Sequence, residues 1–195
     1  MLEWLLAHGA DANGTNEFGD TVLMEAAESD ALSCVESLLR FGADPITADD
    51  CQIRAIHHAT SLPVARALIA ADSESVNAIS GTGEWPLKIS AERNDVQFIE
   101  GLLLLGAEVD LTSTGATALH AAINYDSREA AERLLCAGAD PNAADVDGWT
   151  PLCSARSREA VQLLLAHGAD HAAKDECGSR PKDCVDDPLV AELLT

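Results

Sequence analysis

The chain has 195 residues, a length that suits one large domain or two small ones, and its 47% hydrophobic content is enough to bury a continuous core. Its aromatic residues are only three Trp, three Phe and one Tyr, so the apolar mass is mostly Ala and Leu and favours thin, closely packed helices over sheet. The longest apolar stretches, such as residues 101–107, are far shorter than the roughly 20 residues that cross a bilayer, so we expect no membrane partner.

The formal net charge is −21, from 33 acidic and 12 basic residues spread along the chain. Such a charge repels nucleic acid, which we therefore exclude as a partner. Two interpretations remain open, because the charge suits either solubility or a basic partner.

The first residues contain neither a basic start nor a small-residue cleavage site, so we see no secretion signal and expect a cytoplasmic protein. The six cysteines are then expected to be free thiols. None of them forms a C-x-x-C pair, which argues against a structural zinc site.

A Gly-Ala-Asp or Gly-Ala-Glu phrase recurs along the chain with steps of 33, 64, 32 and 30 residues, at Gly9, Gly42, Gly106, Gly138 and Gly168. The step of 64 residues is two periods, and a degenerate copy of the phrase stands at residues 72–74. The chain is therefore predicted to be a repeat protein.

A Leu-rich segment with helical spacing precedes each phrase, as at residues 35–40 and 160–165. The glycine that follows supplies the positive φ that ends a helix. Another helix is predicted to begin 11 or 12 residues later, where Thr21, Thr117 and Thr150 can cap its first turn. These helices are shorter than the ~12–15 residues that are marginal in isolation, so the units must be stabilised by stacking.

The period near 33, the Gly-Ala-Asp phrase and the Thr-Pro-Leu that begins at Thr150 together resemble the ankyrin repeat. This resemblance implies an all-α ankyrin-repeat solenoid of helix-turn-helix units joined by β-hairpin-like loops, about six repeats including partial end units. We expect a single domain over residues 1–195 that consists of a half repeat 1–13, repeats 14–46, 47–77, 78–110, 111–142 and 143–172, and a degenerate C-terminal cap 173–195.

Several segments depart from the family pattern. Arg54 and Trp85 stand where Thr should cap a helix, and we expect each to weaken that helix start by about 1 kcal/mol. Repeats 47–77 and 143–172 lack about three residues between their two helices, which predicts tight turns there.

The half repeat at residues 1–13 has no first helix before it. Part of the apolar surface formed by Leu2, Leu5 and Leu6 should therefore face water. We expect missing repeats or a second molecule to cover this end.

Histidines and cysteines are the candidates for chemistry. The resemblance implies that His57 and His120 bond locally to backbone and Thr. His167 and His171 have the spacing of a metal pair, but Gly168 ends the helix between them, so we predict no metal site.

Cys51 is predicted at a loop tip near His57, in a fold that offers a shallow groove instead of a closed pocket. The Gly-Thr-Gly at residues 81–83 follows no predicted strand and lacks the lysine of a phosphate-binding loop. We predict no enzymatic activity and no cofactor.

The resemblance implies that loop tips and first helices form a concave surface for a protein or peptide partner. Carried over residue by residue, the predicted partner-binding residues are Glu17, Phe18, Asp20, Glu25, Glu28, Asp50, Ile53, His58, Thr82, Glu84, Ile89, Glu92, Asn124, Val146, Asp147 and Trp149. The same pattern also includes Cys51, Ser61, Ser113, Thr114, Ala116 and Ala121.

The acidic residues among them favour a partner with basic groups, and Phe18 and Trp149 are the predicted anchors. Single exposed aromatics are also ordinary on protein surfaces. The predicted function is a protein-binding scaffold or adaptor. A structural or assembly segment is the first alternative, and an enzyme with a His/Cys site is the second.

Overall fold

The computed structural model describes residues 1–184 and 191–194. These residues form helices and loops without a named strand, and isolated β-bridges join Thr15 to Thr21 and Ala48 to Arg54. This confirms the all-α class. The chain divides into two compact units, residues 1–86 with 104–107, and residues 87–103 with 108–195. The single domain over residues 1–195 stays a prediction.

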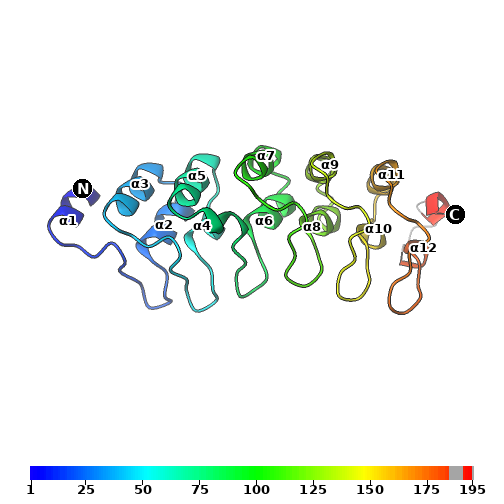
Figure 1. Ribbon diagram of the computed structural model, residues 1–195, viewed down its shortest axis with the longest axis horizontal. Coiled ribbons are helices and arrows are strands. Elements are labelled where there is room, and N and C mark those ends of the chain that lie inside the picture. The colour runs from blue at the N-terminus through cyan, green and yellow to red at the C-terminus, as the bar shows by residue number, and fades with distance from the viewer. Residues whose placement is uncertain (185–190, 195) are drawn as a thin grey trace. The chain divides into compact units, whose positions relative to one another are not determined.

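The first unit contains the half repeat and two full helix pairs. In chain order its helices are α1 (Leu2–Ala7), α2 (Val22–Glu28), α3 (Leu32–Arg40), α4 (Ala55–His58), α5 (Leu62–Ala71) and the 3-10 helix η1 (Ser73–Asn77). Helix α2 packs on α4 and α3 packs on α5, so the two kinds of helix form two rows, with the loops projecting beyond α2 and α4 (Figure 1).

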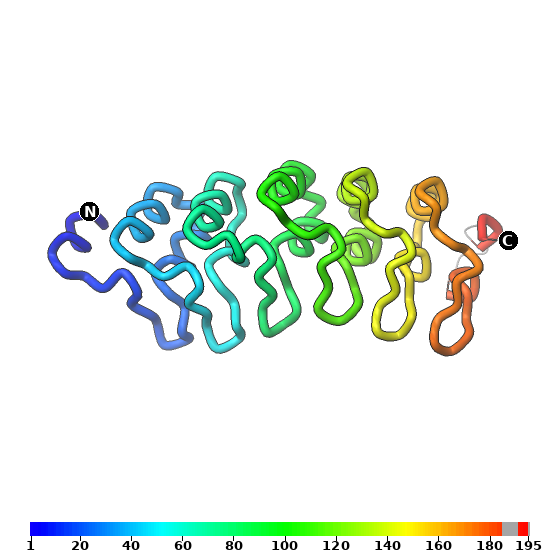
Figure 2. Tube along the Cα trace, in the orientation of Figure 1, coloured from blue at the N-terminus to red at the C-terminus, as the bar shows by residue number. Residues whose placement is uncertain are grey.

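The second unit repeats this arrangement, with α9 and α11 in one row and α8 and α10 in the other (Figures 1 and 2). Its helices are α6 (Pro86–Glu92), α7 (Val96–Leu104), α8 (Ala118–Asn124), α9 (Arg128–Cys136), α10 (Pro151–Ser154), α11 (Arg158–Ala166), α12 (Pro181–Cys184) and the 3-10 helix η2 (Glu192–Leu194). Pro86 and Leu104 belong to the first unit. Part of the predicted cap, residues 185–190 and 195, lies outside the described residues.

Glycine ends the second helices as predicted. All the glycines of the Gly-Ala-Asp/Glu phrases have φ between 87° and 98°. The next residue closes the helix, as where the N–H of Ala139 donates to the carbonyl of Leu134 over 3.0 Å. In the degenerate repeat no such glycine is present, and α5 passes through Asp72 into η1.

The threonine caps are confirmed only in part. Thr21 Oγ1 accepts the N–H of Met24 at 3.2 Å. The Thr117 hydroxyl instead lies 3.0 Å from His120 Nδ1, and the Thr150 hydroxyl lies 3.7 Å from Cys153 Sγ. At both helix starts the hydroxyl thus bonds to the side chain three residues on.

Arg54 provides no side-chain cap for α4, as predicted from the absence of Thr at this position. The Arg54 N–H donates instead to His57 Nδ1 at 2.9 Å, so the histidine satisfies a group at this helix start. Trp85 is buried, with 1% of its surface exposed. The stability cost of both substitutions stays a prediction.

Asparagines after the second helices join successive repeats within each unit. In the first unit, Asn13 donates to the carbonyl of Gly42 at 3.1 Å and accepts the N–H of Asp44 at 2.8 Å. In the second unit, Asn142 makes the same pair of bonds, to Gly168 at 3.0 Å and from Asp170 at 2.7 Å. These side chains fix the spacing at which one repeat follows the next.

Candidate protein-interaction surfaces

The loops between repeats are held in shape by a buttressing side chain at their base. In the first unit, Asn16 Oδ1 accepts the N–H groups of Phe18 at 2.9 Å and Asp20 at 3.0 Å. In the second unit, Asp145 Oδ1 accepts those of Asp147 at 2.9 Å and Trp149 at 2.8 Å. The polar side chain turns inward to the backbone, and the residues between are left to face outward.

Neighbouring loops within a unit also bond to each other. In the first unit the N–H of Gly81 donates to the carbonyl of Cys51 at 2.8 Å. In the second unit Val146 donates to Thr114 at 3.3 Å, and Glu176 donates to Asp147 at 3.2 Å. The loop tips of a unit thus form a supported row instead of independent flexible segments.

The predicted residues of the first unit are all accessible to some degree. Phe18 is 66% exposed on the loop tip before α2. The exposed members of the set are Glu17, Glu25, Glu28, Asp50, Cys51 and Thr82, and the half-buried members are Asp20, Ile53, His58, Ser61 and Glu84. Glu17 and Asp20 lie on the loop at residues 14–21, and Glu25 and Glu28 lie at exposed positions of α2.

The second unit carries fewer charges and more apolar surface among its predicted residues. Val146 is 64% exposed and Trp149 is 41% exposed on the loop before α10. Asn124 and Asp147 are exposed, and Ile89 and Glu92 are half-buried. Glu92 also pairs with Lys88 at 3.2 Å.

One predicted surface residue is wrong. Ala121 is only 5% exposed, because α8 packs against both α9 and α10 and covers this side chain. The other members of that group, Ser113, Thr114 and Ala116, are exposed or half-buried. The candidate residues divide between the two units, so each unit has its own candidate surface.

His57 and His120 bond as predicted and also reach beyond their own helices. His120 Nδ1 accepts the N–H of Thr117 at 3.1 Å, so Nε2 carries the proton and donates to the carbonyl of Trp149 at 3.1 Å. His57 Nε2 likewise bonds to the carbonyl of Ala78 at 3.0 Å. Burial lowers the pKa of both imidazoles, which keeps them neutral. His120 therefore supports the backbone of Trp149, one of the two predicted anchors.

The cysteines include one thiol whose pKa is raised. All six are free, and Cys51 is exposed on its loop. Burial raises the pKa of the Cys184 thiol to about 11, with the neighbouring Cys153 adding to the effect. Raising a thiol pKa lowers the thiolate fraction that would act as a nucleophile or metal ligand.

The described ranges contain no group of three or more His, Cys, Asp or Glu side chains placed to hold a metal ion. Within the same ranges, no helix combines the length and the apolar character needed to span a membrane.

Sequence reasoning missed the asparagines that link repeats and the acidic residues that link helix pairs. Asp126, with φ of 53°, accepts the Ser157 hydroxyl at 2.8 Å in the second unit, and Asp30 accepts that of Ser61 in the first. The recurrence of Asn at the same place in several repeats was a usable signal for the first group.

Comparison with known proteins shows what this architecture resembles. The family model "Ankyrin repeats (3 copies)" matches residues 1–80, 57–145 and 87–175. The crystal structure of the ankyrin repeat domain of Bcl-3 has a TM-score of 0.85 and 25% identity, over 99% of this chain and 90% of that one. An ankyrin repeat domain from Acinetobacter baumannii has a TM-score of 0.72 and 28% identity, over 86% of this chain and 97% of that one.

Curated relatives are similar over part of their length. The B-cell lymphoma 3 protein homolog of Mus musculus is 29% identical over 80% of this chain and 37% of its own length. The Neurogenic locus Notch protein of Drosophila melanogaster is 47% identical over 33% of this chain and 2% of its own length. The chain thus spans well under two thirds of these relatives.

Proposed function

This chain belongs to the ankyrin-repeat family, whose domains are generally protein–protein interaction modules and typically non-enzymatic scaffolds, and from this we propose that it is an adaptor that holds a protein or peptide carrying basic groups. The partner lies against the loop tips and first helices. The observation that carries the proposal is the group of exposed, unpaired carboxylates in the first unit.

Those carboxylates are Glu17, Glu25, Glu28 and Asp50, which are exposed and form no ion pair with any residue in the described part of the chain. Unpaired surface charge of one sign attracts a partner of the opposite sign and speeds its encounter. Phe18 supplies an apolar contact beside them, and Trp149 with Val146 supplies one in the second unit.

The charge of −21 also supports the absence of nucleic-acid binding in this proposal. In this proposal the protein is cytoplasmic and has neither enzymatic activity nor a membrane partner. The neutral, internally bonded histidines and the raised pKa of the Cys184 thiol support the non-catalytic part.

An assembly role is the second candidate, favoured by the uncovered side of α2. Val22 is 39% exposed, whereas Ala55 and Ala118, which begin α4 and α8, are 1% and 0% exposed. Trp4 and Leu5 on α1 are 61% and 43% exposed. We propose that a helix from further repeats or from a second molecule covers this apolar surface.

Replacing Glu25 and Glu28 together by Gln tests the basic-partner proposal. Association with a synthetic lysine-rich peptide should slow in the variant and slow further as salt rises, because exposed charges are screened beyond about 8–10 Å at physiological ionic strength. Biolayer interferometry at low and high salt measures this. A glutamate-rich peptide of equal length should not bind.

A matched control replaces Glu132 and Glu159 by Gln, which removes the same charge from exposed positions on α9 and α11. This control should associate like the wild type. Salt-independent binding, or binding that the Glu25 and Glu28 substitutions leave unchanged, would reject the basic partner and leave the fold intact.

A further inference from the structure

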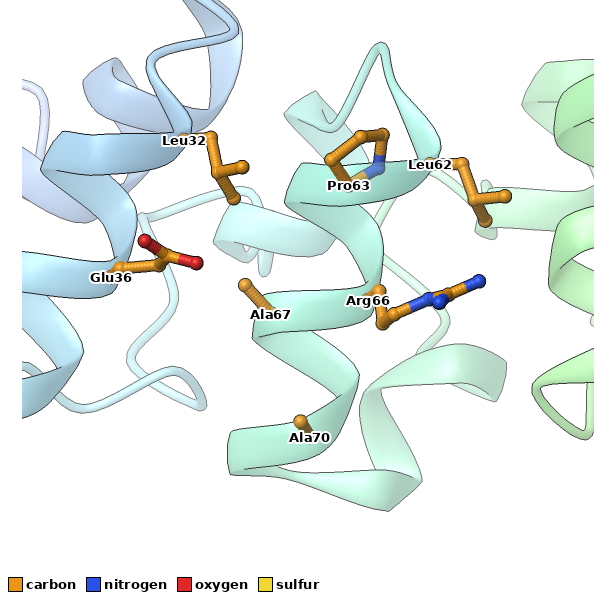
Figure 3. A pocket seen from close by; sticks show the side chains of 7 residues that line it. All are labelled: Leu32, Glu36, Leu62, Pro63, Arg66, Ala67 and Ala70. Atoms are coloured by element: carbon orange, nitrogen blue, oxygen red, sulfur yellow. The ribbon is translucent and has the colours of Figure 1, made fainter.

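A groove of about 410 Å³ lies between the second helices α3 and α5 of the first unit. Leu32 and Glu36 line it from α3, and Leu62, Pro63, Arg66, Ala67 and Ala70 line it from α5 (Figure 3). This surface is formed by the second helices, whereas the proposed binding residues lie on loops and first helices. The groove is therefore separate from the surface proposed to hold the basic partner.

The groove occurs at a repeat whose turn between helices is short. Helix α4 ends at His58 and α5 already begins at Leu62. The Ser61 hydroxyl donates to Asp30, which ties the start of α5 to the turn before α3. Ala67 and Ala70 are small, so little side-chain volume fills the space beside α3.

The second unit contains the same construction with different side chains. There the Ser157 hydroxyl bonds to Asp126 at 2.8 Å, 96 residues further along the chain. At the same offset, Leu32, Leu62 and Pro63 are replaced by Arg128, Arg158 and Glu159, all three of them exposed.

A repeat with the short turn thus tolerates charged residues at all three positions. Packing of the fold does not require apolar residues there. The apolar surface at α3 and α5, where Leu32 and Leu62 are half-buried and Pro63 is exposed, is consequently a property of this pair of repeats, as expected of a contact surface for another molecule.

Charge at the groove favours one kind of occupant. Glu36 is exposed and its carboxylate points toward α5, whereas the guanidinium of Arg66, which also lines the groove, points away from α3 (Figure 3). Neither residue forms an ion pair within residues 1–184 and 191–194. A carboxylate beside apolar walls complements a basic group that adjoins apolar side chains.

We propose that this groove is a second docking site, for a peptide segment of a partner protein that presents adjacent apolar side chains and a Lys or Arg opposite Glu36. A second copy of this chain is disfavoured as the occupant, because its net charge of −21 opposes close approach of two copies. The proposal is independent of the basic-partner site, since it rests on other helices and other residues.

The test uses the full chain and a library of short random peptides displayed on phage. Peptides are selected on the wild type and counter-selected on a variant that combines Leu32→Arg, Leu62→Arg and Pro63→Glu, the residues found in the second unit. Enriched peptides should combine neighbouring apolar residues with a Lys or Arg. A chemically synthesised version of an enriched peptide should bind the triple variant at least about tenfold more weakly than it binds the wild type.

Glu36→Lys should weaken the same peptide similarly, whereas Glu132→Lys, at the corresponding place on α9, should leave its binding unchanged. Circular dichroism checks that each variant is folded, and Pro63→Glu alone replaces the triple variant if that variant fails to fold. The Glu25→Gln and Glu28→Gln changes should not affect binding of this peptide. The groove proposal and the basic-partner proposal can therefore be rejected independently of each other.

Several results would overturn the proposal. One is the absence of peptides that prefer the wild type, and another is binding that survives both Glu36→Lys and the groove substitutions. Sedimentation velocity supplies a third, namely a concentration-dependent dimer of the wild type that the groove variant loses, because the occupant would then be a second copy.

Discussion

Gly115 illustrates how a single loop residue controls the approach of neighbouring repeats. Its φ is +80°, and a Cβ atom there would lie 2.6 Å from Asp145 Cα in the next loop of the second unit. Gly178 has nearly the same backbone conformation, with φ of +83°, but a Cβ there would meet nothing within 4 Å. A comparison of the two positions therefore distinguishes the cost of backbone strain from the cost of a steric clash.

Gly115→Ala should lower the free energy of unfolding by about 2–4 kcal/mol, since it adds a clash with backbone to the strain of positive φ. Gly178→Ala should lower it by only about 1 kcal/mol, from strain alone. Urea denaturation of both variants measures the difference. Equal losses would show that the loops separate freely and that their close packing has no energetic role.

We expect His120 to make the free energy of unfolding depend on pH. Burial lowers its pKa in the folded chain below the value of about 6.5 in the unfolded chain. As pH falls below about 6.5, the unfolded chain binds a proton that the folded chain does not, so the free energy of unfolding decreases. The loss reaches at most about 1.4 kcal/mol per pH unit and ends at the folded pKa.

His120→Gln should remove this contribution, so that the variant loses less stability than the wild type between about pH 7.5 and about pH 5.5. Urea denaturation at both pH values measures it. Exposed His171 provides the control, because His171→Gln should keep the wild-type dependence. If His120→Gln retains the full decrease, the pH response comes from other groups.

Among the elements, α2 and α4 contrast a capped helix start with an uncapped one. The Thr21 hydroxyl accepts the N–H of Met24, whereas Arg54 offers no acceptor to the first turn of α4. Helix α4 spans only the four residues Ala55–His58. A missing cap in so short a helix leaves a large share of its backbone N–H groups without a helical partner.

Arg54→Thr should raise the free energy of unfolding by about 0.5–1 kcal/mol, because a Thr hydroxyl at this position can donate to His57 Nδ1, as the Thr117 hydroxyl does to His120. Thr21→Ala should lower it by about 1 kcal/mol. Thermal and urea denaturation report both changes. A neutral or destabilising Arg54→Thr would indicate that His57 already satisfies this helix start.

For the whole molecule, the N-terminal helix α1 is only partly covered. Leu6 of α1 is buried, but Trp4 and Leu5 are largely exposed, and α1 packs on α3. Few buried apolar contacts give a low free energy of local opening. Covering several such side chains would contribute roughly 1.5–3 kcal/mol each.

Backbone amides of residues 2–8 should therefore exchange hydrogen faster than those of α3 and α8 in a monomeric sample of this chain. Hydrogen exchange with mass spectrometry measures the rates, and sedimentation establishes that the sample is monomeric. Protection of residues 2–8 equal to that of the central helices would mean that this end needs no covering helix.

The sequence alone determined the features that depend on local spacing. The period, the glycines that end helices, the degenerate copy at residues 72–74 and the bonding of His57 and His120 all follow from residue type at fixed intervals. Exposure of Phe18 and Trp149 was also predictable, because a loop tip has no neighbour to bury it. These features need only the conformation of one repeat.

Tertiary structure decided what depends on the neighbouring repeat. Ala121 is buried because α9 and α10 pack around it. The asparagine links and the groove between α3 and α5 likewise arise only when two repeats stack. Repeat periodicity specifies each unit, but burial and hydrogen bonding between units depend on distances that no single repeat contains.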